Sequence, residues 1–341
     1  MTYTRRHFAQ HALATLAAAQ LAACRCNESG REVVVYTSVD QPFSEPVFEA
    51  FEQATGVKTR AVFDTEETKS TGVLNRLIAE GEHPQADVFW SGDPVRPFSL
   101  MKRGLVQPYV SPEADGIPEG FRAADGSWTG FAARARVLLV NTVRLGDEPA
   151  PASIRDLAAP RFKGKTAIAN PLFGTTTMHV AALFASWGPV RARAFMKELK
   201  DAGVRVASSN GEVKRLVVAG EITFGLTDTD DANEALKAGA KVEVVYPDQD
   251  ELGALVMPTT AVLIKGGPNE QQGKRLIDYL ISAEVERRMA ESAAHMPLRS
   301  GVATPANVRS VSDIRAMKAD YAKVASEMES IQPWLRDWTG L

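Results

Sequence analysis

Three aspartates gather within four positions of the sequence, directly after an apolar run. The stretch FGLTDTDDANEA contains Asp228, Asp230 and Asp231. Carboxylates so close together could bind a metal ion, attract a cation or cap a helix. Counted as a calcium loop from Asp228, the sixth position is Asn233 instead of glycine and the twelfth is Gly239 instead of glutamate, so the calcium interpretation fails. A cation site, and a cap on the following helix by Asp230 or Asp231, both stay open.

A second stretch could bind an anion. In NPLFGTTTMHVAALFASWG, a predicted helix begins at Gly174, Thr175, Thr176 and Thr177. Unpaired backbone N–H groups and the positive end of the helix dipole face outward at such a start, and the threonine hydroxyls add donors. Threonines at a helix start also serve as caps, and that alternative stays open. With no arginine or lysine nearby, we expect this pocket to use neutral donors.

The sequence has no set of residues typical of an enzyme. His83, His179 and His295 are far apart, and the patterns H-E-x-x-H, G-x-S-x-G and the phosphate-binding P-loop do not occur near them. Hydrolysis or group transfer would therefore depend on aspartate and serine alone. We predict a protein that binds its ligand without catalysis and without a cofactor.

The N-terminal residues are typical of an export signal. Arg5 and Arg6 precede a mildly apolar stretch that is too short to span a membrane, and small residues lead to Cys24. The segment around the arginines resembles a twin-arginine signal, and LAAC resembles a bacterial lipobox. We therefore predict that residues 1–26 direct export, by the twin-arginine or the Sec route, and that Cys24 carries a lipid. Cys26 is the other cysteine of the chain, so the mature body is expected to lack disulfides and thiolate metal sites.

Composition indicates an ordinary globular protein. The chain has 341 residues, of which 45% are hydrophobic, and a formal net charge of −3. Roughly 100–200 residues per domain favours two domains. No Lys/Arg-rich run provides the footprint of nucleic-acid binding. Strand and helix patterns alternate, beginning with EVVVYTS and EPVFEAFEQATG, which predicts an α/β protein whose parallel sheets are covered by helices.

Two stretches predict that the chain passes between domains and returns. Residues 108–130 are rich in Pro, Gly and Asp, and FAARARVLLVNT then has the pattern of a strand that bridges two domains. ELGALVMPTTAVLIKGGP indicates the return. We predict a first lobe of residues 31–135 and 255–300, and a second lobe of residues 136–254 and 301–341.

These patterns resemble a known family. VVVYTSVDQPFSEPVFEAFEQATGVK, YPDQDELGALVMPTTAVLIKGGPN and MPLRSG, with ADVFW and the threonine stretch between them, are similar to periplasmic solute-binding proteins of ABC importers. The relevant branch contains ferric-ion-binding and 2-aminoethylphosphonate-binding proteins, and the likeness extends from Arg31 to Ser300. It implies the two-lobed type II periplasmic binding protein fold. In that fold, hinge strands join two α/β lobes that close on a ligand in the cleft between them, and the ligand is delivered to a permease in the inner membrane.

The resemblance also selects the residues expected at the ligand. Ferric-binding relatives use a histidine or acid, a glutamate and a pair of tyrosines, and this sequence has Asp40, Gly92 followed by Asp93, and Thr229-Asp230 at those positions. Because the tyrosines are missing, ferric iron would need a different set of ligands, and no metal site is predicted. The predicted ligand-binding residues are Ser38, Asp40, Trp90, Asp93, Gly174, Thr175, Thr176, Asn210, Thr227, Asp228 and Asp230.

Together these residues predict a zwitterion such as 2-aminoethylphosphonate. The phosphonate would bind the threonine stretch, and the ammonium group would meet an aspartate and an aromatic face such as Trp90. Further donors are expected from Ser38, Asn210 and Thr227, and carboxylates from Asp40, Asp228 and Asp230. Two alternatives stay open: a cleft re-lined for a hydrophobic lipid such as a sterol, and ferric iron held with a synergistic anion. Converging donors and carboxylates would favour the zwitterion, and a deep apolar cavity the lipid.

Overall fold

Apolar runs that end in small polar residues form the strands, and stretches with helical periodicity form the helices between them, as the sequence predicts. A computed structural model describes residues 31–64 and 72–340. The predicted export signal and Cys24 lie outside these residues. The strands are β1 (Glu32–Thr37), β2 (Lys58–Phe63), β3 (Val88–Ser91), β4 (Val106–Gln107), β5 (Thr129–Asn141), β6 (Thr166–Ala169), β7 (Arg205–Ala207), β8 (Phe224–Asp228), β9 (Val242–Val245) and β10 (Val256–Ile264).

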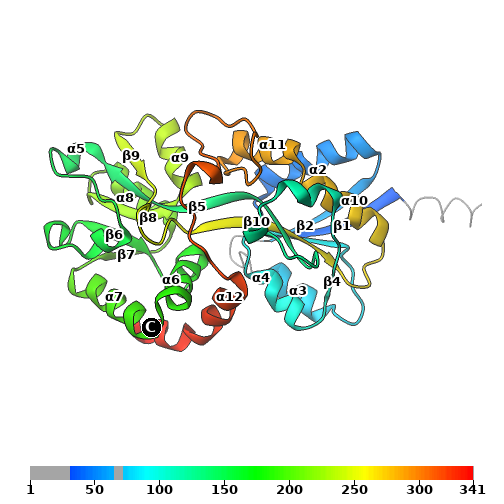
Figure 1. Ribbon diagram of the computed structural model, residues 1–341, viewed down its shortest axis with the longest axis horizontal. Helices are drawn as coiled ribbons and strands as arrows, with labels where there is room; N and C mark the ends of the chain where they lie inside the picture. Colours follow the sequence, from blue (N-terminus) through cyan, green and yellow to red (C-terminus); the bar gives the residue numbers. More distant parts are fainter. Residues whose placement is uncertain (1–30, 65–71, 341) are drawn as a thin grey trace, which may run out of the picture.

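Helices connect these strands and cover both faces of the sheet (Figure 1). They are α2 (Gln41–Thr55), α3 (Gly72–Ala79), α4 (Arg96–Lys102), α5 (Thr142–Leu145), α6 (Gly174–Trp187), α7 (Pro189–Asp201), α8 (Asn210–Val218), α9 (Thr229–Lys237), α10 (Glu270–Leu280), α11 (Ala283–Ala293), α12 (Tyr321–Ser330) and α13 (Gln332–Thr339). Short 3-10 turns occupy Pro112–Gly116, Glu119–Phe121, Ile154–Ala158, Pro160–Phe162 and Val311–Asp313.

The first lobe is built on the parallel strands β2, β1 and β3, followed by β10. Alternate residues of β1 point to opposite faces, so Val33 and Val35 pack with α2, α10 and α11, whereas Tyr36 packs with α3 and α4. Burial on both faces explains why β1 is a continuous apolar run rather than an alternating one.

The second lobe is built on the parallel strands β8, β6 and β7. Leu138 and Val140 of β5 pack with α6, α7, α12 and α13 on one face of the sheet. Val137 and Leu139 pack with α8 and α9 on the other. Between residues 137 and 140 of β5, side chains with odd and even numbers therefore point to opposite faces of the sheet.

Two strands join the lobes, and they correct one prediction. β5 pairs with β10 up to Ala135 and with β8 from Arg136 on, and every one of these pairings is antiparallel. The sheet is therefore mixed, not purely parallel, because β5 and β10 carry the chain between the lobes in opposite directions. The predicted lobe boundaries stay a prediction, which this change of partner supports.

The carboxyl ends of the parallel strands in both lobes point at the junction between the lobes. Asp228, the last residue of β8, pairs with Arg136, which is the first residue of β5 to leave the first lobe. Ser91, the last residue of β3, pairs with Thr260 of β10. Open α/β sheets bind their ligands at these ends, so the sheet directs the turns after β1, β3, β6, β7 and β8 toward one place.

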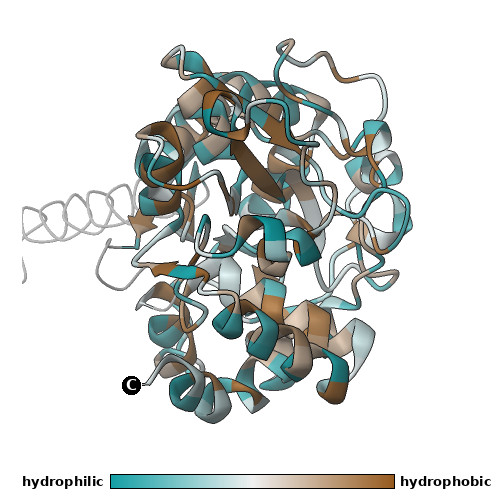
Figure 2. Cartoon of the chain, turned by 90° about the vertical axis from the view of Figure 1, so that its left-hand side faces the viewer, coloured by the Kyte–Doolittle hydropathy of each residue, from teal (hydrophilic) through white to brown (hydrophobic). Residues whose placement is uncertain are grey.

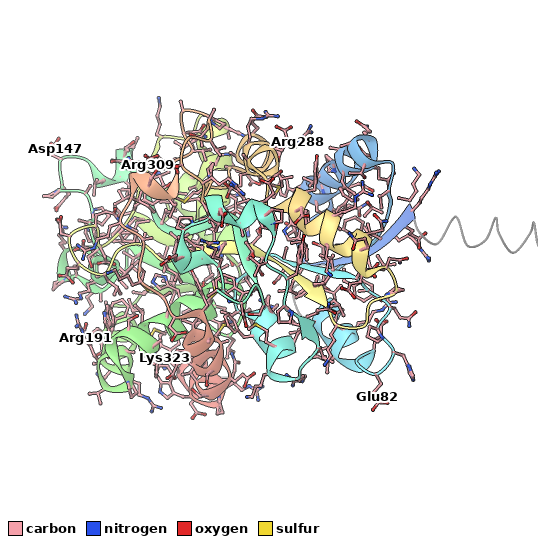
Figure 3. All side chains as sticks on the ribbon, turned by 45° about the vertical axis from the view of Figure 1, so that its right-hand side comes forward. Glu82, Asp147, Arg191, Arg288, Arg309 and Lys323 are labelled. Carbon is pink, nitrogen blue, oxygen red and sulfur yellow. The ribbon has the colours of Figure 1, made fainter. Side chains whose placement is uncertain are left out.

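Helix α12, near the C-terminus, packs on the outside of both lobes. α12 packs against α6 of the second lobe and also contacts α4 of the first. The Tyr321 hydroxyl of α12 donates a hydrogen bond to the carbonyl of Val256, at 2.9 Å, where β10 begins. Hydrophobic colour concentrates on the strands in Figure 2, and charged side chains such as Glu82, Asp147 and Arg191 lie at the periphery in Figure 3.

Candidate functional site

Two arginines of β5 lie at the junction between the lobes, and the sequence analysis did not predict either of them. Arg134 and Arg136 are separated by one residue, so their side chains leave the strand on the same side. The side chain of Arg136 is 0% exposed and that of Arg134 is 20% exposed. The expectation of an anion pocket with neutral donors alone is therefore wrong.

Arg136 is the centre of a buried cluster. Its Nη1 donates to Asp228 Oδ1 at 2.6 Å, to Thr175 Oγ1 at 3.0 Å and to Asn210 Oδ1 at 3.0 Å. Its Nη2 donates to Thr176 Oγ1 at 3.2 Å. We call Arg136, Thr175, Thr176, Asn210 and Asp228 the buried cluster. It joins β5 and β8 to the starts of α6 and α8.

The other carboxylate oxygen of Asp228 is also engaged. It accepts hydrogen bonds from Thr175 Oγ1 at 2.9 Å and from Asn210 Nδ2 at 3.2 Å. The Asp228 side chain is 3% exposed. The structure thus brings four predicted site residues together, but it commits their polar atoms to Arg136. Buried charges need such partners, because desolvation of an unpaired ion costs several kcal/mol.

Arg134 and Asp230, which we call the interlobe pair, have the same residue types but lie nearer the surface. Arg134 Nη1 lies 3.3 Å from Asp230 Oδ2 and 3.6 Å from Asp228 Oδ2. Arg134 Nη2 donates to the carbonyl of Gly92 in the first lobe at 3.1 Å. Burial lowers the pKa of Arg134, but the carboxylates of Asp230, Asp228 and Asp40 outweigh burial and raise it above its ordinary value. The guanidinium thus stays charged and contacts both lobes.

The remaining aspartate of the opening stretch has a separate partner. Asp231 Oδ1 lies 3.3 Å from Lys214 Nζ, and Asp231 Oδ2 accepts from Thr227 Oγ1 at 3.2 Å. Burial, together with Asp230 and Asp228, raises the pKa of Asp231 to about 6. Burial and like charges both disfavour ionisation of Asp231, and together they outweigh the lysine.

The capping alternative that the sequence left open for Asp230 or Asp231 does not hold. α9 begins at Thr229, so Asp228 is the N-cap residue, and its side chain makes no capping hydrogen bond. Asp230 and Asp231 lie in the first turn of α9, where the helix dipole favours negative charge. The three aspartates therefore have three environments: a buried ion pair, an interlobe ion pair and a lysine pair.

The predicted residues of the first lobe hold the turn between β3 and α4. Ser38 Oγ accepts from the Gly92 N–H at 2.9 Å. Asp93 Oδ1 accepts from the backbone N–H groups of Val95 and Arg96, at 2.9 and 3.1 Å, and the Asp93 carboxylate pairs with the Arg96 guanidinium. Ser38 and Asp93 thus position the Gly92 carbonyl that Arg134 contacts.

Trp90 is a core residue. It is 0% exposed, and its ring packs against Phe48 and Phe131 at centroid distances of 5.6 and 5.5 Å. The sequence places Trp90 at a strand end, but the side of the sheet on which its ring lies depends on the covering helices. Trp90 is therefore not retained as an aromatic contact for the ligand.

The start of α6 keeps its backbone donors. Phe173, the residue before the helix, makes no side-chain capping bond, and it is 65% exposed. Gly174 is exposed as well, with φ of +60° and open space where a Cβ would lie. An anion could approach this turn through its N–H groups, whereas the hydroxyls of Thr175 and Thr176 are occupied by the buried cluster.

Two buried histidines are unsuited to binding an anion as cations. Burial, together with the neighbouring Arg136 and Arg134, respectively, lowers the pKa of His179 and of His295 to about 3. Both imidazoles are therefore neutral at physiological pH.

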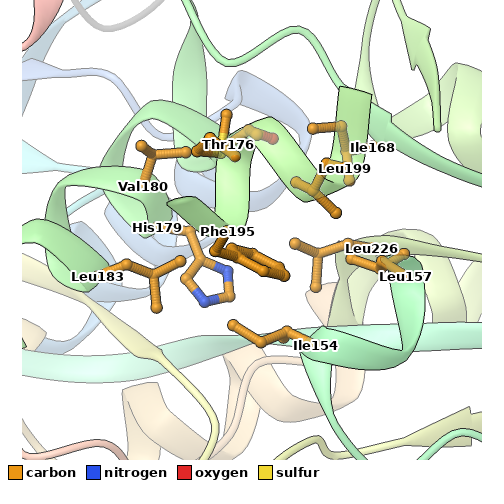
Figure 4. A pocket seen from close by; sticks show the side chains of 11 residues that line it. Ile154, Leu157, Ile168, Thr176, His179, Val180, Leu183, Phe195, Leu199 and Leu226 are labelled. Carbon is orange, nitrogen blue, oxygen red and sulfur yellow. The ribbon is translucent and has the colours of Figure 1, made fainter. Parts of the chain in front are cut away.

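The apolar cavity of the second lobe is small. His179 lines it with Thr176, Leu183, Phe195 and other apolar side chains beneath α6 (Figure 4). Its volume is about 20 Å³, which is room for about one water molecule. A sterol does not fit there.

The described residues provide neither a metal cluster nor a membrane span. Within residues 31–64 and 72–340, no three His, Cys, Asp or Glu side chains gather in a way that could hold a metal ion. The helices of this same part of the chain are all too short or too polar to cross a membrane.

Known proteins provide an independent comparison. Residues 84–326 match the family model described as bacterial extracellular solute-binding protein. A periplasmic protein of Salmonella typhimurium, named as a candidate 2-aminoethylphosphonate-binding protein, is 28% identical over 305 residues, which cover 88% of this chain and 83% of that protein. The major ferric iron-binding protein of Neisseria meningitidis serogroup B is 26% identical over 305 residues, or 87% and 89% of the two chains.

Solved structures share the fold. The crystal structure of apo ferric ion-binding protein A from Pasteurella haemolytica superposes with a TM-score of 0.80 at 25% identity, covering 90% of this chain and 97% of that one. The two-lobed architecture expected from the sequence is therefore confirmed.

Proposed function

The chain belongs to the bacterial extracellular solute-binding protein family, and on this basis we propose that its ligand is a small zwitterion with a phosphonate or phosphate group, such as 2-aminoethylphosphonate. The chain is a substrate-binding protein of an ABC importer, which binds a small ligand in the periplasm and delivers it to a membrane permease. Such proteins are carriers, not enzymes.

The interlobe pair is the observation that carries the proposal. Arg134 contacts the first lobe through Gly92 and the second through Asp230, at a position where the strand ends of both lobes converge. The Asp40 carboxylate is close enough to raise the pKa of Arg134. A cation and two carboxylates thus lie at one junction, and a zwitterion can satisfy both signs of charge there.

The exposed groups at the junction between the lobes suggest which residues would bind each charged group of the ligand. The phosphonate would bind Arg134 and the first-turn N–H groups of α6, and the ammonium group would bind Asp230 and Asp40. The hydroxyls and amide of the buried cluster hold these groups in position, since a site is useful only when its supporting residues are fixed. Asp228, Thr175, Thr176 and Asn210 therefore support the site from the buried cluster and do not contact the ligand directly.

The names of several relatives favour ferric iron as the alternative ligand. The tyrosine pair expected for iron is replaced here by Thr229-Asp230, and Asp230 is paired with Arg134. Iron would have to displace that arginine and recruit a synergistic anion. The charge pattern therefore favours the zwitterion.

Isothermal titration calorimetry of the purified protein tests the proposal. We expect 2-aminoethylphosphonate to bind more tightly than ethylphosphonate, which lacks the amine, and more tightly than ethanolamine, which lacks the phosphonate. Ferric citrate and ferric ion with phosphate are the competing ligands. Binding of a ferric ligand with no heat from any phosphonate would reject the zwitterion and establish the alternative.

We also propose that Cys24 anchors the exported protein by a lipid. The lipobox-like LAAC motif supports this. A Cys24→Ala variant should move from the membrane fraction to the soluble periplasmic fraction, and Cys26→Ala should stay with the membrane. A wild-type protein found in the soluble fraction would contradict the anchor.

A further inference from the structure

Asp230 occupies the place on Arg134 that a ligand anion would take. We propose that Asp230 is a built-in competitor for Arg134, and that this competition makes the site select ligands that carry an ammonium group as well as an anion. This inference rests on the proposed function.

Both terminal nitrogens of Arg134 already have partners, and its Nε, which has none, is buried. Nη2 is used by the Gly92 carbonyl at 3.1 Å, which joins the arginine to the first lobe. Nη1 faces Asp230 Oδ2 at 3.3 Å. Asp228 Oδ2 lies on the other side of Nη1 at 3.6 Å, so a phosphonate that binds Nη1 would be a third anion there. It must displace the Asp230 carboxylate, because three anions around one nitrogen repel one another strongly.

Asp230 is able to move, whereas the carboxylate of Asp228 is not. Asp228 accepts four hydrogen bonds from Arg136, Thr175 and Asn210 and is 3% exposed. Asp230 is 32% exposed, and apart from Arg134 its side chain accepts the N–H of Asp231 at 3.1 Å. Exposed ion pairs are weak, and buried networks are costly to break.

The displaced carboxylate explains the selectivity. Once released from Arg134, Asp230 is a negative charge beside Asp228 and Asp231, and these charges already disfavour one another. An ammonium group on the same ligand restores a partner for Asp230. A simple phosphonate leaves Asp230 without its cation, so a simple phosphonate must bind less tightly.

This mechanism predicts an unusual sign for the effect of Asp230→Asn. If Asp230 only supported the site, its removal would weaken every ligand. As a competitor, its removal should strengthen binding of ethylphosphonate, because the uncharged amide of the variant would no longer hold Arg134 in an ion pair. Binding of 2-aminoethylphosphonate should lose its advantage over ethylphosphonate, because the ammonium group no longer has Asp230 as a partner.

The test is calorimetry of wild type, Asp230→Asn and Asp231→Asn with both phosphonates. We expect Asp230→Asn to bind ethylphosphonate about tenfold more tightly, the size of a modest coupling between close charges. Its preference for 2-aminoethylphosphonate over ethylphosphonate should be at least about tenfold smaller than that of wild type. Asp231→Asn removes the same charge one residue along, where the partner is Lys214. It should bind ethylphosphonate as wild type does.

Each other outcome is decisive. Equal losses for both phosphonates in a folded Asp230→Asn protein, verified by its melting curve, would overturn the competitor role and leave the proposed function intact. An equal gain in Asp231→Asn would overturn it too, because the effect would then be one of overall charge. If wild type and Asp230→Asn bind neither phosphonate, both the proposed function and this inference fail.

Discussion

Arg136–Asp228 and Arg134–Asp230 are two ion pairs of the same residue types, offset by two residues on the same two segments of chain. The first pair is sealed, with 0% and 3% of its side chains exposed. The second is accessible, with 20% and 32% exposed. The two pairs thus differ in solvent exposure. The buried pair, Arg136–Asp228, stabilises the second lobe, whereas the exposed pair, Arg134–Asp230, can exchange a partner for a ligand.

The difference in depth follows from the sheet. Arg136 lies where β5 pairs with β8, and the starts of α6 and α8 cover its guanidinium. Arg134 lies two residues earlier, where β5 is still paired with β10, and its partners are Asp230 in the first turn of α9 and the Gly92 carbonyl. Two residues along β5 therefore separate an arginine in the core of the second lobe, Arg136, from one at the junction between the lobes, Arg134.

The strongest test of this comparison removes the deep arginine. Arg136→Met removes the closest cation of the buried Asp228 carboxylate and leaves Arg134 Nη1 at 3.6 Å. Breaking such a buried pair costs about 3–5 kcal/mol of folding free energy. Urea denaturation followed by circular dichroism measures the loss. The double variant Arg136→Met, Asp228→Leu should recover part of the stability. Unchanged stability in the single variant would show that the cluster is not structural.

Substitution of Arg134, the more exposed arginine, should affect ligand binding more than stability. Arg134→Gln should alter the free energy of unfolding by less than about 1 kcal/mol, because the pair is partly solvated. It should weaken 2-aminoethylphosphonate binding by about 10–100-fold, as expected for the loss of a charge-assisted hydrogen bond. Calorimetry and denaturation on the same sample separate the two effects. Arg134→Lys keeps the charge but not the forked geometry of the guanidinium. Its affinity for 2-aminoethylphosphonate should lie between those of wild type and Arg134→Gln. A large loss of stability with unchanged affinity would reverse the comparison.

A smaller effect concerns Asp231, beside both pairs. Its pKa is raised from 3.8 to about 6, so the folded protein binds a proton more readily than the unfolded chain. The free energy of unfolding of wild type therefore increases as the pH falls from about 6 to about 4 and Asp231 takes up its proton. Above about pH 6 this stabilising contribution is lost. Asp231→Asn should be more stable than wild type by about 1–2 kcal/mol at pH 8. That difference should vanish near pH 3.5.

Denaturation at several pH values checks this prediction. Glu234→Gln is the matched control, because it removes a 66% exposed carboxylate from the same lysine. Its stability difference from wild type should be small at every pH. A pH-independent difference for Asp231→Asn would contradict the assignment.

Much of the fold could be predicted because its signals are local. The apolar run EVVVYT forms β1, and FAARARVLLVN lies within β5, which pairs first with β10 and then with β8. The direction of β5 and β10 could not be read in this way, because strand pairing depends on segments that are distant in sequence.

The site was only partly predictable for the same reason. Asp228, Thr175 and Asn210 were selected by their neighbours in sequence and by family resemblance. Arg136 lies 92 positions before Asp228, and only the sheet register brings them together. A signal did exist: two arginines inside an otherwise apolar strand are costly to bury without partners, and they indicate that carboxylates must be close.

The position of β10 has a consequence for how the protein is made. β10 lies between β3 and β5, although its residues come after every strand of the second lobe. A nascent chain that has emerged only as far as β9 holds all the strands of the second lobe, but one side of β3 is still without its partner. An open strand edge of this kind can pair with other chains. The first lobe is therefore exposed to aggregation until residues 256–264 have been synthesised.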